Sequence, residues 1–308
     1  MADSQPLPID YNLHWYSIKD ILGMGGFGIT YLARDTKLNQ NVAIKEFMPQ
    51  GLMTRSGDHS LHATGINHER VIRWGLERFV TEANTLRLFN HPNIVKVHSI
   101  IRKNNTAYIV MNYEHGKTLF VLLKEGKQFN EQQLRDMILP LLNGLEMIHN
   151  QGFVHRDIKP GNIFIRHDNS PVLIDFGSAR FALEEEDGET KTLTQLTTPG
   201  YAPFEQYQGR SDLQGPWTDI YSLGATLYRV ITGEPPVDSV HRRRLTDEAA
   251  IQEMWGKLEK YTDRYSIPFL QAVEHALRSN IKSRPQTTTE WRKMLTNNDG
   301  PSGIQKNK

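Results

Sequence analysis

The chain contains no cysteine among its 308 residues, which excludes disulfides, thiolate metal sites and a cysteine nucleophile. It also lacks an excess of charge of one sign, because 36 Lys and Arg stand against 35 Asp and Glu, for a formal net charge of +1. Proteins that mainly bind nucleic acid or anionic membranes usually carry a clear positive excess. The sequence therefore predicts no nucleic-acid partner.

Long apolar runs are missing as well. No stretch approaches about 18 consecutive apolar residues, so we expect no membrane segment in this chain. Residues 1–10 contain acids and prolines but no apolar core, unlike a signal peptide. Together with the lack of cysteine, these features lead us to expect a cytoplasmic protein. Residues 297–308 are mostly polar residues and glycine with little to bury, and we expect a flexible tail there.

Hydrophobic patterning in the first third of the chain indicates strands around one helix. The expected strands cover 17–22, 29–33, 41–47, 94–101 and 107–111. Apolar residues recur at helical spacing over 76–86, and the pattern stops before a His-Pro pair. The polar stretch 48–68 breaks both periods and is predicted to be a loop insertion.

Helical patterns dominate after residue 118, with short expected strands at 163–165 and 172–174. The expected helices cover 134–150, 219–232, 246–261, 268–278 and 289–295. This arrangement predicts an α+β, bilobal fold: a small antiparallel β lobe with one helix, and a larger, mainly helical lobe. The expected divisions are an N-terminal extension at 1–14, a small lobe at 15–113 with an insertion at about 49–70, a large lobe at 114–296 and the tail at 297–308.

A glycine cluster, Gly23, Gly25, Gly26 and Gly28, lies between the first two expected strands. A G-x-G-x-x-G pattern alone also fits a simple glycine-rich turn. A dinucleotide site requires a helix that begins at the glycines, but residues 29–32 are mainly β-branched and aromatic. We therefore predict a hairpin tip whose backbone N–H groups lie against phosphate oxygens.

Lys45 ends the sequence Val-Ala-Ile-Lys in the next expected strand. An isolated lysine in such a strand would more often be an edge residue that faces solvent. Because this strand lies beside the glycine hairpin, we interpret the Lys45 ammonium as a phosphate-binding group.

Two later motifs concentrate groups suited to phosphate chemistry. Residues 155–162 read His-Arg-Asp-Ile-Lys-Pro-Gly-Asn and bring together a candidate base, two cations and an amide. Residues 175–177 read Asp-Phe-Gly and follow a short apolar strand. Taken singly, the first fits a charged surface loop and the second fits a turn. In this order after the glycines and Lys45, they favour a phosphotransferase site.

The ordered motifs resemble those of eukaryotic-type (Hanks-type) Ser/Thr protein kinases over roughly residues 16–295. The amino-acid sequences of residues 25–33 and 200–206 resemble those of bacterial members of the family, which act in bacterial signalling. The resemblance implies the protein-kinase fold, ATP as cofactor with Mg²⁺ (Mn²⁺ as an alternative), and protein substrates phosphorylated on Ser or Thr. Two alternatives stay open at this stage: an ATP-binding pseudokinase and a small-molecule phosphotransferase.

The resemblance also implies roles for single residues. Asp157 matches the base that accepts the substrate hydroxyl proton, Lys159 matches the lysine beside the transferred phosphate, and Asn162 and Asp175 match the metal-holding positions. The same resemblance implies a nucleotide-binding site formed by Leu22, Gly23, Met24, Gly25, Gly26, Phe27, Gly28, Thr30, Ala43, Lys45, Glu82, Met111, Asn112, Glu114 and Phe164. Glu82, rather than Glu77, is expected to pair with Lys45.

Departures from the family pattern are confined to a few positions. Phe204 replaces the proline of the A-P-E motif, while Glu205 is expected to pair with Arg284 in a structural role. The long insertion contains histidines, which we expect to be solvated rather than to bind metal; they are His59, His62 and His68.

The segment from Ser178 to Thr198 joins the Asp-Phe-Gly motif to the expected substrate platform. We predict self-phosphorylation at Thr190, Thr192 or Thr194, with Arg156 as the partner of the phosphate. Thr198 is the least favoured phosphosite. The acidic residues of 184–189 are the competing partner for Arg156, and a solvated acidic loop is the simplest role for them.

Overall fold

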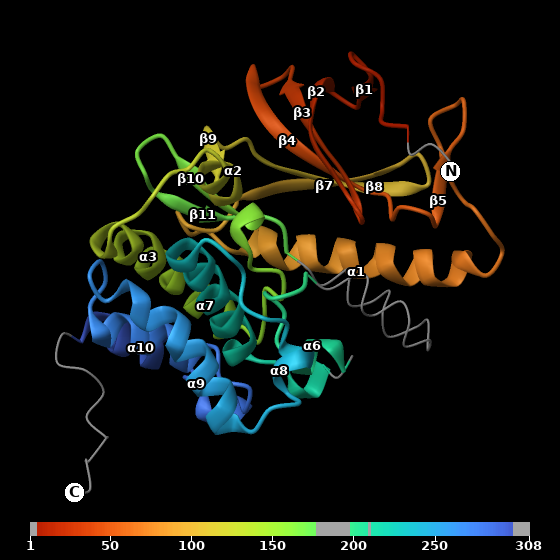
Figure 1. Cartoon of the computed structure of the whole chain (residues 1–308). Helices are drawn as coiled ribbons and strands as arrows, with labels where there is room; N and C mark the ends of the chain where they lie inside the picture. The colour runs from red at the N-terminus through yellow and green to blue at the C-terminus, as the bar shows by residue number, and fades with distance from the viewer. Residues whose placement is uncertain (1–4, 177–197, 209–210, 298–308) are drawn as a thin grey trace, which may run out of the picture. The chain divides into compact units, whose positions relative to one another are not determined.

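The computed structural model describes residues 5–176, 198–208 and 211–297. These residues form two compact units, coloured from red to blue along the chain in Figure 1. Of the described residues, the first unit comprises 5–91 and 95–115, and the second comprises 92–94, 116–176, 198–208 and 211–297.

The first unit is built on a six-stranded antiparallel sheet in the order β1-β2-β3-β4-β8-β7. The strands are β1 (Asn12–Leu13), β2 (Tyr16–Gly25), β3 (Gly28–Asp35), β4 (Gln40–Phe47), β7 (Val97–Lys103) and β8 (Thr106–Asn112). All five strands expected from the sequence are present, each with boundaries shifted by a few residues. The strand β8 is buried along almost its whole length because it lies inside the sheet, between β4 and β7.

One long helix, α1 (His68–Leu88), packs against β7 and β8, as Figure 1 shows. Its buried side chains include Phe79, Ala83 and Leu86, so the apolar spacing in the sequence identified the inward face correctly. The helix ends before Phe89, ahead of the His-Pro pair, as predicted.

The insertion is not a structureless loop, which corrects the prediction for 48–68. It contains a two-stranded antiparallel hairpin, β5 (Met53–Arg55) and β6 (Leu61–Ala63). Met53 and Leu61 are buried, at 3% and 2% exposure. Strands of three residues are too short for alternation to be visible in the sequence, because a period of two needs several repeats.

The second unit is mainly helical and includes one small antiparallel sheet in the order β11-β10-β9. Its strands are β9 (Gly116–Thr118), β10 (Ile163–Arg166) and β11 (Pro171–Leu173), and its helices of six residues or more are α2 (Leu119–Lys124), α3 (Glu131–His149), α7 (Pro216–Thr232), α9 (Asp247–Leu258), α10 (Ile267–Ala276) and α11 (Thr288–Thr296). Two short helices, α6 (Phe204–Tyr207) and α8 (Ser239–Arg242), also belong to this unit. The helix α7 is buried along most of its length and packs against α3, α9, α10 and α11.

Across residues 5–176, 198–208 and 211–297, no helix combines the length and the hydropathy that crossing a bilayer requires. The domain limits expected from the sequence remain predictions.

Candidate active site

The glycine cluster forms the tip of the β2–β3 hairpin, as predicted. Gly25 pairs with Gly28 across a two-residue turn, and Met24 pairs with Ile29. A Cβ added at Gly28 would lie 1.9 Å from the Glu46 carbonyl oxygen, so the packing of β3 on β4 requires this glycine. A Cβ at Gly23, Gly25 or Gly26 would meet nothing within 4 Å. Packing does not require glycine at these three positions, and their lack of a side chain would allow a ligand to approach the backbone closely.

Strand register gathers four of the predicted nucleotide residues on one face of the sheet. Thr30 pairs with Lys45, and Ala43 pairs with Met111. Directly paired residues share a face, and so do residues two apart on one strand. The face is therefore common to all four, although they come from β3, β4 and β8.

The helix α1 covers this same face of the sheet. Phe47, two residues after Lys45 on β4, contacts Phe79 of α1 with ring centroids 5.4 Å apart. Glu82 follows Phe79 by less than one helical turn and is 5% exposed. This placement is compatible with an ion pair between Lys45 and Glu82, which remains a prediction.

The opposite face of the sheet carries a buried ionic cluster that sequence reasoning missed. The Glu46 carboxylate, 0% exposed, accepts hydrogen bonds from the Tyr31 hydroxyl and the Tyr108 hydroxyl, both at 2.7 Å, and from Arg55 Nη2 at 2.6 Å. Arg55 comes from β5 of the insertion, and its Nε donates to the Gln5 carbonyl at 2.7 Å. Burial, reinforced by the Glu46 charge, raises the pKa of both tyrosines. The insertion is therefore tied into the sheet directly behind Lys45.

The chain after β8 carries the residues expected to meet adenine. The Asn112 N–H donates to the Lys96 carbonyl at 2.9 Å, and the Asn112 side-chain oxygen lies 2.7 Å from His98 Nε2. Of the two main-chain groups of Asn112, the N–H is therefore occupied, and the carbonyl is the one that could accept a hydrogen bond from an adenine edge. Leu22, Met24, Glu114 and Phe164 are described but no contact assigns them to a nucleotide, so their roles remain predictions.

The second unit brings Asp157, Lys159 and Asn162 together. Lys159 Nζ lies 3.0 Å and 2.9 Å from the two Asp157 carboxylate oxygens and 3.2 Å from Thr198 Oγ1. Asn162 Nδ2 donates to Asp157 Oδ2 at 2.9 Å and to the Asp157 carbonyl at 2.7 Å. The Asp157 carboxylate is thus held by a cation and an amide, and the same cation also contacts the Thr198 hydroxyl.

Asp219 of α7 holds the backbone of the loop that carries Asp157, and this role was not predicted from the sequence. Its carboxylate accepts from the backbone N–H groups of His155 and Arg156, each at 2.8 Å, and lies 2.7 Å from His149 Nε2. Burial alone would raise the pKa of Asp219, but the His149 hydrogen bond and the other donors lower it overall. The sequence signal that could have identified Asp219 is an acidic residue within the largely apolar helical pattern of α7.

Two residues at the site adopt left-handed backbone conformations that non-glycine residues rarely adopt. Arg156 has φ 70° and Asp175 has φ 57°. The His155 ring packs against Phe176 in a tilted arrangement, with ring centroids 4.1 Å apart, and burial lowers the pKa of His155. The lowered pKa favours the neutral form of this buried ring.

Asn162 and Asp175 were expected to hold metal. Asn162 Nδ2 lies 3.4 Å from the Asp175 carbonyl, so the two residues are direct neighbours in the structure. Among the described residues, no group of three or more His, Asp and Glu is arranged to hold a metal ion. A metal bound by one or two protein oxygens together with substrate phosphates needs no such group, and Mg²⁺ is usually bound in that way. The residues present fit such an ion.

The predicted structural pair is confirmed. Arg284 Nη1 donates to Glu205 Oε1 at 2.7 Å, with side chains only 1% and 2% exposed. The adjacent Gln206 Nε2 donates to the Arg156 carbonyl at 2.8 Å, which connects α6 to the catalytic loop.

The insertion histidines contact protein groups. His62 Nε2 lies 3.2 Å from Ser56 Oγ, His68 Nδ1 lies 2.9 Å from Thr64 Oγ1, and the His59 ring packs edge-on against Tyr11. The predicted phosphosites Thr190, Thr192 and Thr194 and the acidic stretch 184–189 lie outside the described residues.

Comparisons with known proteins agree on a family. The model of the protein kinase domain matches residues 16–295. Serine/threonine-protein kinase PknA of Nostoc sp. is 34% identical over 88% of this chain and 48% of its own length. Serine/threonine-protein kinase PknB of Mycobacterium leprae is 31% identical over 90% of this chain and 42% of its own length. The chain spans about half the length of the curated relatives it matches.

Solved structures agree on the fold. The apo form of PpkA-294 has a TM-score of 0.81 at 36% identity and covers 94% of this chain and 99% of its own. Rad53 residues 1–466 in complex with AMP-PNP has a TM-score of 0.65 at 21% identity, covering 90% of this chain and 64% of that one, which shows the fold alone. The predicted fold class, a small antiparallel β lobe and a larger helical lobe, is confirmed.

Proposed function

Because the chain belongs to the protein kinase domain family, we propose that it transfers the γ-phosphoryl group of ATP to Ser and Thr hydroxyls of protein substrates, including its own segment from Ser178 to Thr198. The observation that carries the proposal is the arrangement of Asp157, Lys159, Asn162 and Thr198 in one loop cluster. Relatives at 30–34% identity over most of the chain are named Ser/Thr protein kinases, which supports the choice of Ser and Thr over other acceptors.

In the proposed reaction, Asp157 orients the substrate hydroxyl and accepts its proton as the oxygen attacks the phosphorus. Lys159, held between Asp157 and Thr198, supplies positive charge next to the transferred group. The family uses ATP with a divalent metal, and we propose Mg²⁺ held by Asn162 and Asp175. A bound divalent ion neutralises charge on the phosphates.

For the nucleotide, we propose that the glycine turn and Lys45 bind the phosphates, while Ala43, Met111 and the Asn112 carbonyl meet the adenine. Three features support this assignment: three turn glycines that packing does not require, a face shared by Thr30, Ala43, Lys45 and Met111, and a buried Glu82 on the helix that covers that face. A cytoplasmic location stays a prediction of the sequence.

The test is a transfer assay with radiolabelled ATP, Mg²⁺ and a generic protein substrate, followed by phosphoamino-acid analysis. We expect label on phosphoserine and phosphothreonine. Nucleotide binding without transfer would instead support a pseudokinase, and transfer only to small molecules would support a small-molecule phosphotransferase. The presence of Lys45, Asp157 and Asp175 argues against the pseudokinase.

A further inference from the structure

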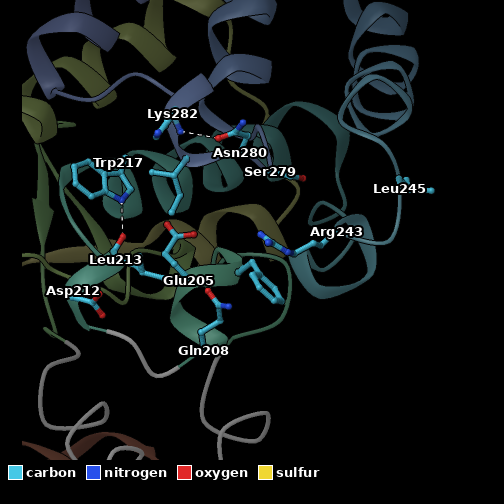
Figure 2. A pocket seen from close by; sticks show the side chains of 12 residues that line it. Glu205, Gln208, Asp212, Leu213, Trp217, Arg243, Leu245, Ser279, Asn280 and Lys282 are labelled. Carbon is cyan, nitrogen blue, oxygen red and sulfur yellow. Dashed lines mark hydrogen bonds between the residues drawn. The ribbon is translucent and has the colours of Figure 1, made fainter.

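A cavity of about 620 Å³ lies in the second unit, and its lining does not include Asp157, Lys159, Asn162 or Thr198. Its walls come from α6, the chain leading into α7, the chain after α8, and the turn before α11. They include Phe204, Leu213, Trp217, Arg243, Ile281 and Lys282. Figure 2 shows Trp217, Arg243 and Lys282 around this space, with Glu205 between them. A volume of this size accommodates large side chains of a ligand.

The unusual residue of the A-P-E motif forms part of this wall. Phe204 stands where the family motif has proline, and its ring packs under the Arg243 guanidinium, 4.4 Å from the ring centroid. Trp217 is fixed by a hydrogen bond from its Nε1 to the Leu213 carbonyl at 2.9 Å. The apolar walls are thus partly rigid aromatic rings, which lose little freedom when they bind a partner.

Charge around the cavity favours an acidic ligand. The Glu205 carboxylate is already paired with Arg284, which itself does not line the space. Arg243 and Lys282 are exposed, and no carboxylate lies within ion-pair distance of either among the described residues. The other acid on the wall is Asp212, so besides the Glu205 carboxylate, which is paired with Arg284, the wall carries two cations and one carboxylate.

The helix α6 connects the cavity to the loop that carries Asp157. Phe204 and Glu205 line the cavity, while the next residue, Gln206, donates to the Arg156 carbonyl beside Asp157. Within this unit, a protein bound in the cavity would therefore be attached to the same short helix that contacts the catalytic loop. The binding energy of a remote part of a substrate can in this way offset the cost of orienting the reacting groups.

We propose that this cavity is a docking site for an acidic segment of a protein substrate that carries a bulky apolar side chain. The apolar side chain enters between Phe204, Trp217 and Ile281, and the flanking carboxylates face Arg243 and Lys282. The proposal rests on the function proposed above, because it names a second contact of the same substrate class.

The experiment measures binding of a fluorescent twelve-residue peptide by anisotropy, without ATP. The peptide has a central Leu-Phe flanked on both sides by glutamates, and contains no Ser, Thr or Tyr, so it cannot be phosphorylated. One control peptide replaces the glutamates with lysines, and another replaces Leu-Phe with Gly-Gly. We expect both controls to bind about tenfold more weakly or worse.

Arg243→Glu and Lys282→Glu should each weaken binding of the acidic peptide by about tenfold. The matched control is Lys260→Glu, the same charge change at an exposed residue outside the cavity. It should change the dissociation constant by less than about twofold, and thermal melting should be similar in all three variants.

The docking site is refuted if wild type does not distinguish the acidic peptide from its controls, or if the two cavity variants bind like wild type, or if Lys260→Glu weakens binding equally. A chain that transfers phosphate but fails to bind the probe would refute the docking site alone. A chain that binds the probe but transfers no phosphate would refute the proposed function alone.

Discussion

Two residues of the site have an unusual backbone conformation. Arg156 and Asp175 sit in left-handed conformations, which cost free energy in non-glycine residues and persist only where surrounding contacts enforce them. The Asp219 hydrogen bond to the Arg156 N–H and the Gln206 hydrogen bond to the Arg156 carbonyl are such contacts. The strain therefore supports the view that the loop geometry is maintained for chemistry.

The glycine turn offers a residue-scale prediction that separates packing from ligand binding. Gly25→Ala should fold normally, because its Cβ meets nothing within 4 Å, yet raise the KM for ATP by about tenfold, since the methyl group would stand between backbone and phosphates. Gly28→Ala should lower the free energy of unfolding by about 1–3 kcal/mol, because its Cβ would overlap the Glu46 carbonyl. Thermal melts and ATP titrations of the two variants check this. Normal ATP kinetics in Gly25→Ala would contradict the phosphate role of the turn.

His155 gives a prediction on pH. Burial lowers its pKa in the folded protein, so below its ordinary value of 6.5 the unfolded chain binds a proton that the folded one does not. The stability that the neutral His155 contributes to the folded protein is therefore fully present above pH 6.5, and it is lost as the pH falls below 6.5. His155→Phe removes this titration, and the drop in melting temperature from pH 7.5 to pH 5.5 should be smaller in the variant than in wild type. An equal drop in both proteins would show that His155 does not titrate as described.

At the scale of elements, β4 serves two purposes through the alternation of its side chains. Lys45 points to the face proposed for the nucleotide, and its neighbour Glu46 points to the buried cluster with Arg55. The insertion and the N-terminal segment meet in that cluster, because Arg55 also donates to the Gln5 carbonyl. The strand that carries Lys45, the proposed phosphate-binding residue, is thus contacted on its other face by the insertion and the N-terminal segment.

This arrangement predicts a large cost for breaking the buried pair. Arg55→Met should lower the free energy of unfolding by about 3–5 kcal/mol, because it leaves a buried carboxylate without its cation. The control is Arg102→Met, which removes an exposed pair with Glu77, 52% and 57% exposed, and should cost about 1 kcal/mol or less. Denaturant unfolding of both variants measures the difference. Equal costs would mean that the Glu46 cluster adds little to stability.

The sequence predicted the main elements because their periodicity spans several turns or pleats. The face of α1 and the pairing at the glycine hairpin both follow from such patterns. The hairpin at Met53–Arg55 and Leu61–Ala63 did not, since three residues show no period. The sequence also gave no reason to join Arg55 to Glu46, because that contact depends on how the insertion folds back on the sheet.

The catalytic loop shows the same division between local and long-range information. Asp157, Lys159 and Asn162 are close in sequence and their motif is distinctive, so they were predicted together. Asp219 lies far along the chain and acts through backbone N–H groups, which no side-chain motif records. The Glu205–Arg284 pair was predictable only because the family resemblance supplied the long-range connection.

For the whole molecule, we predict control by self-phosphorylation between Ser178 and Thr198. A phosphothreonine brings about two negative charges that Arg156 could bind. Thr198 is disfavoured as a phosphosite, since its hydroxyl already lies 3.2 Å from Lys159 Nζ. Changing Thr190, Thr192 and Thr194 together to alanine should reduce the initial rate on an added protein substrate toward that of enzyme expressed with a phosphatase. A rate equal to that of fully phosphorylated wild type would instead favour the acidic residues of 184–189 as the partner of Arg156.

We propose Asp157 as the base for phosphoryl transfer, and single-turnover transfer by Asp157→Asn is the decisive measurement of that role. Asparagine keeps the size of the side chain but removes the charge and the proton acceptor, so the variant should fold and bind ATP with divalent metal like wild type. We predict that the transfer rate falls by orders of magnitude. A rate within about threefold of wild type, which corresponds to less than about 0.7 kcal/mol in the barrier, would contradict the assignment.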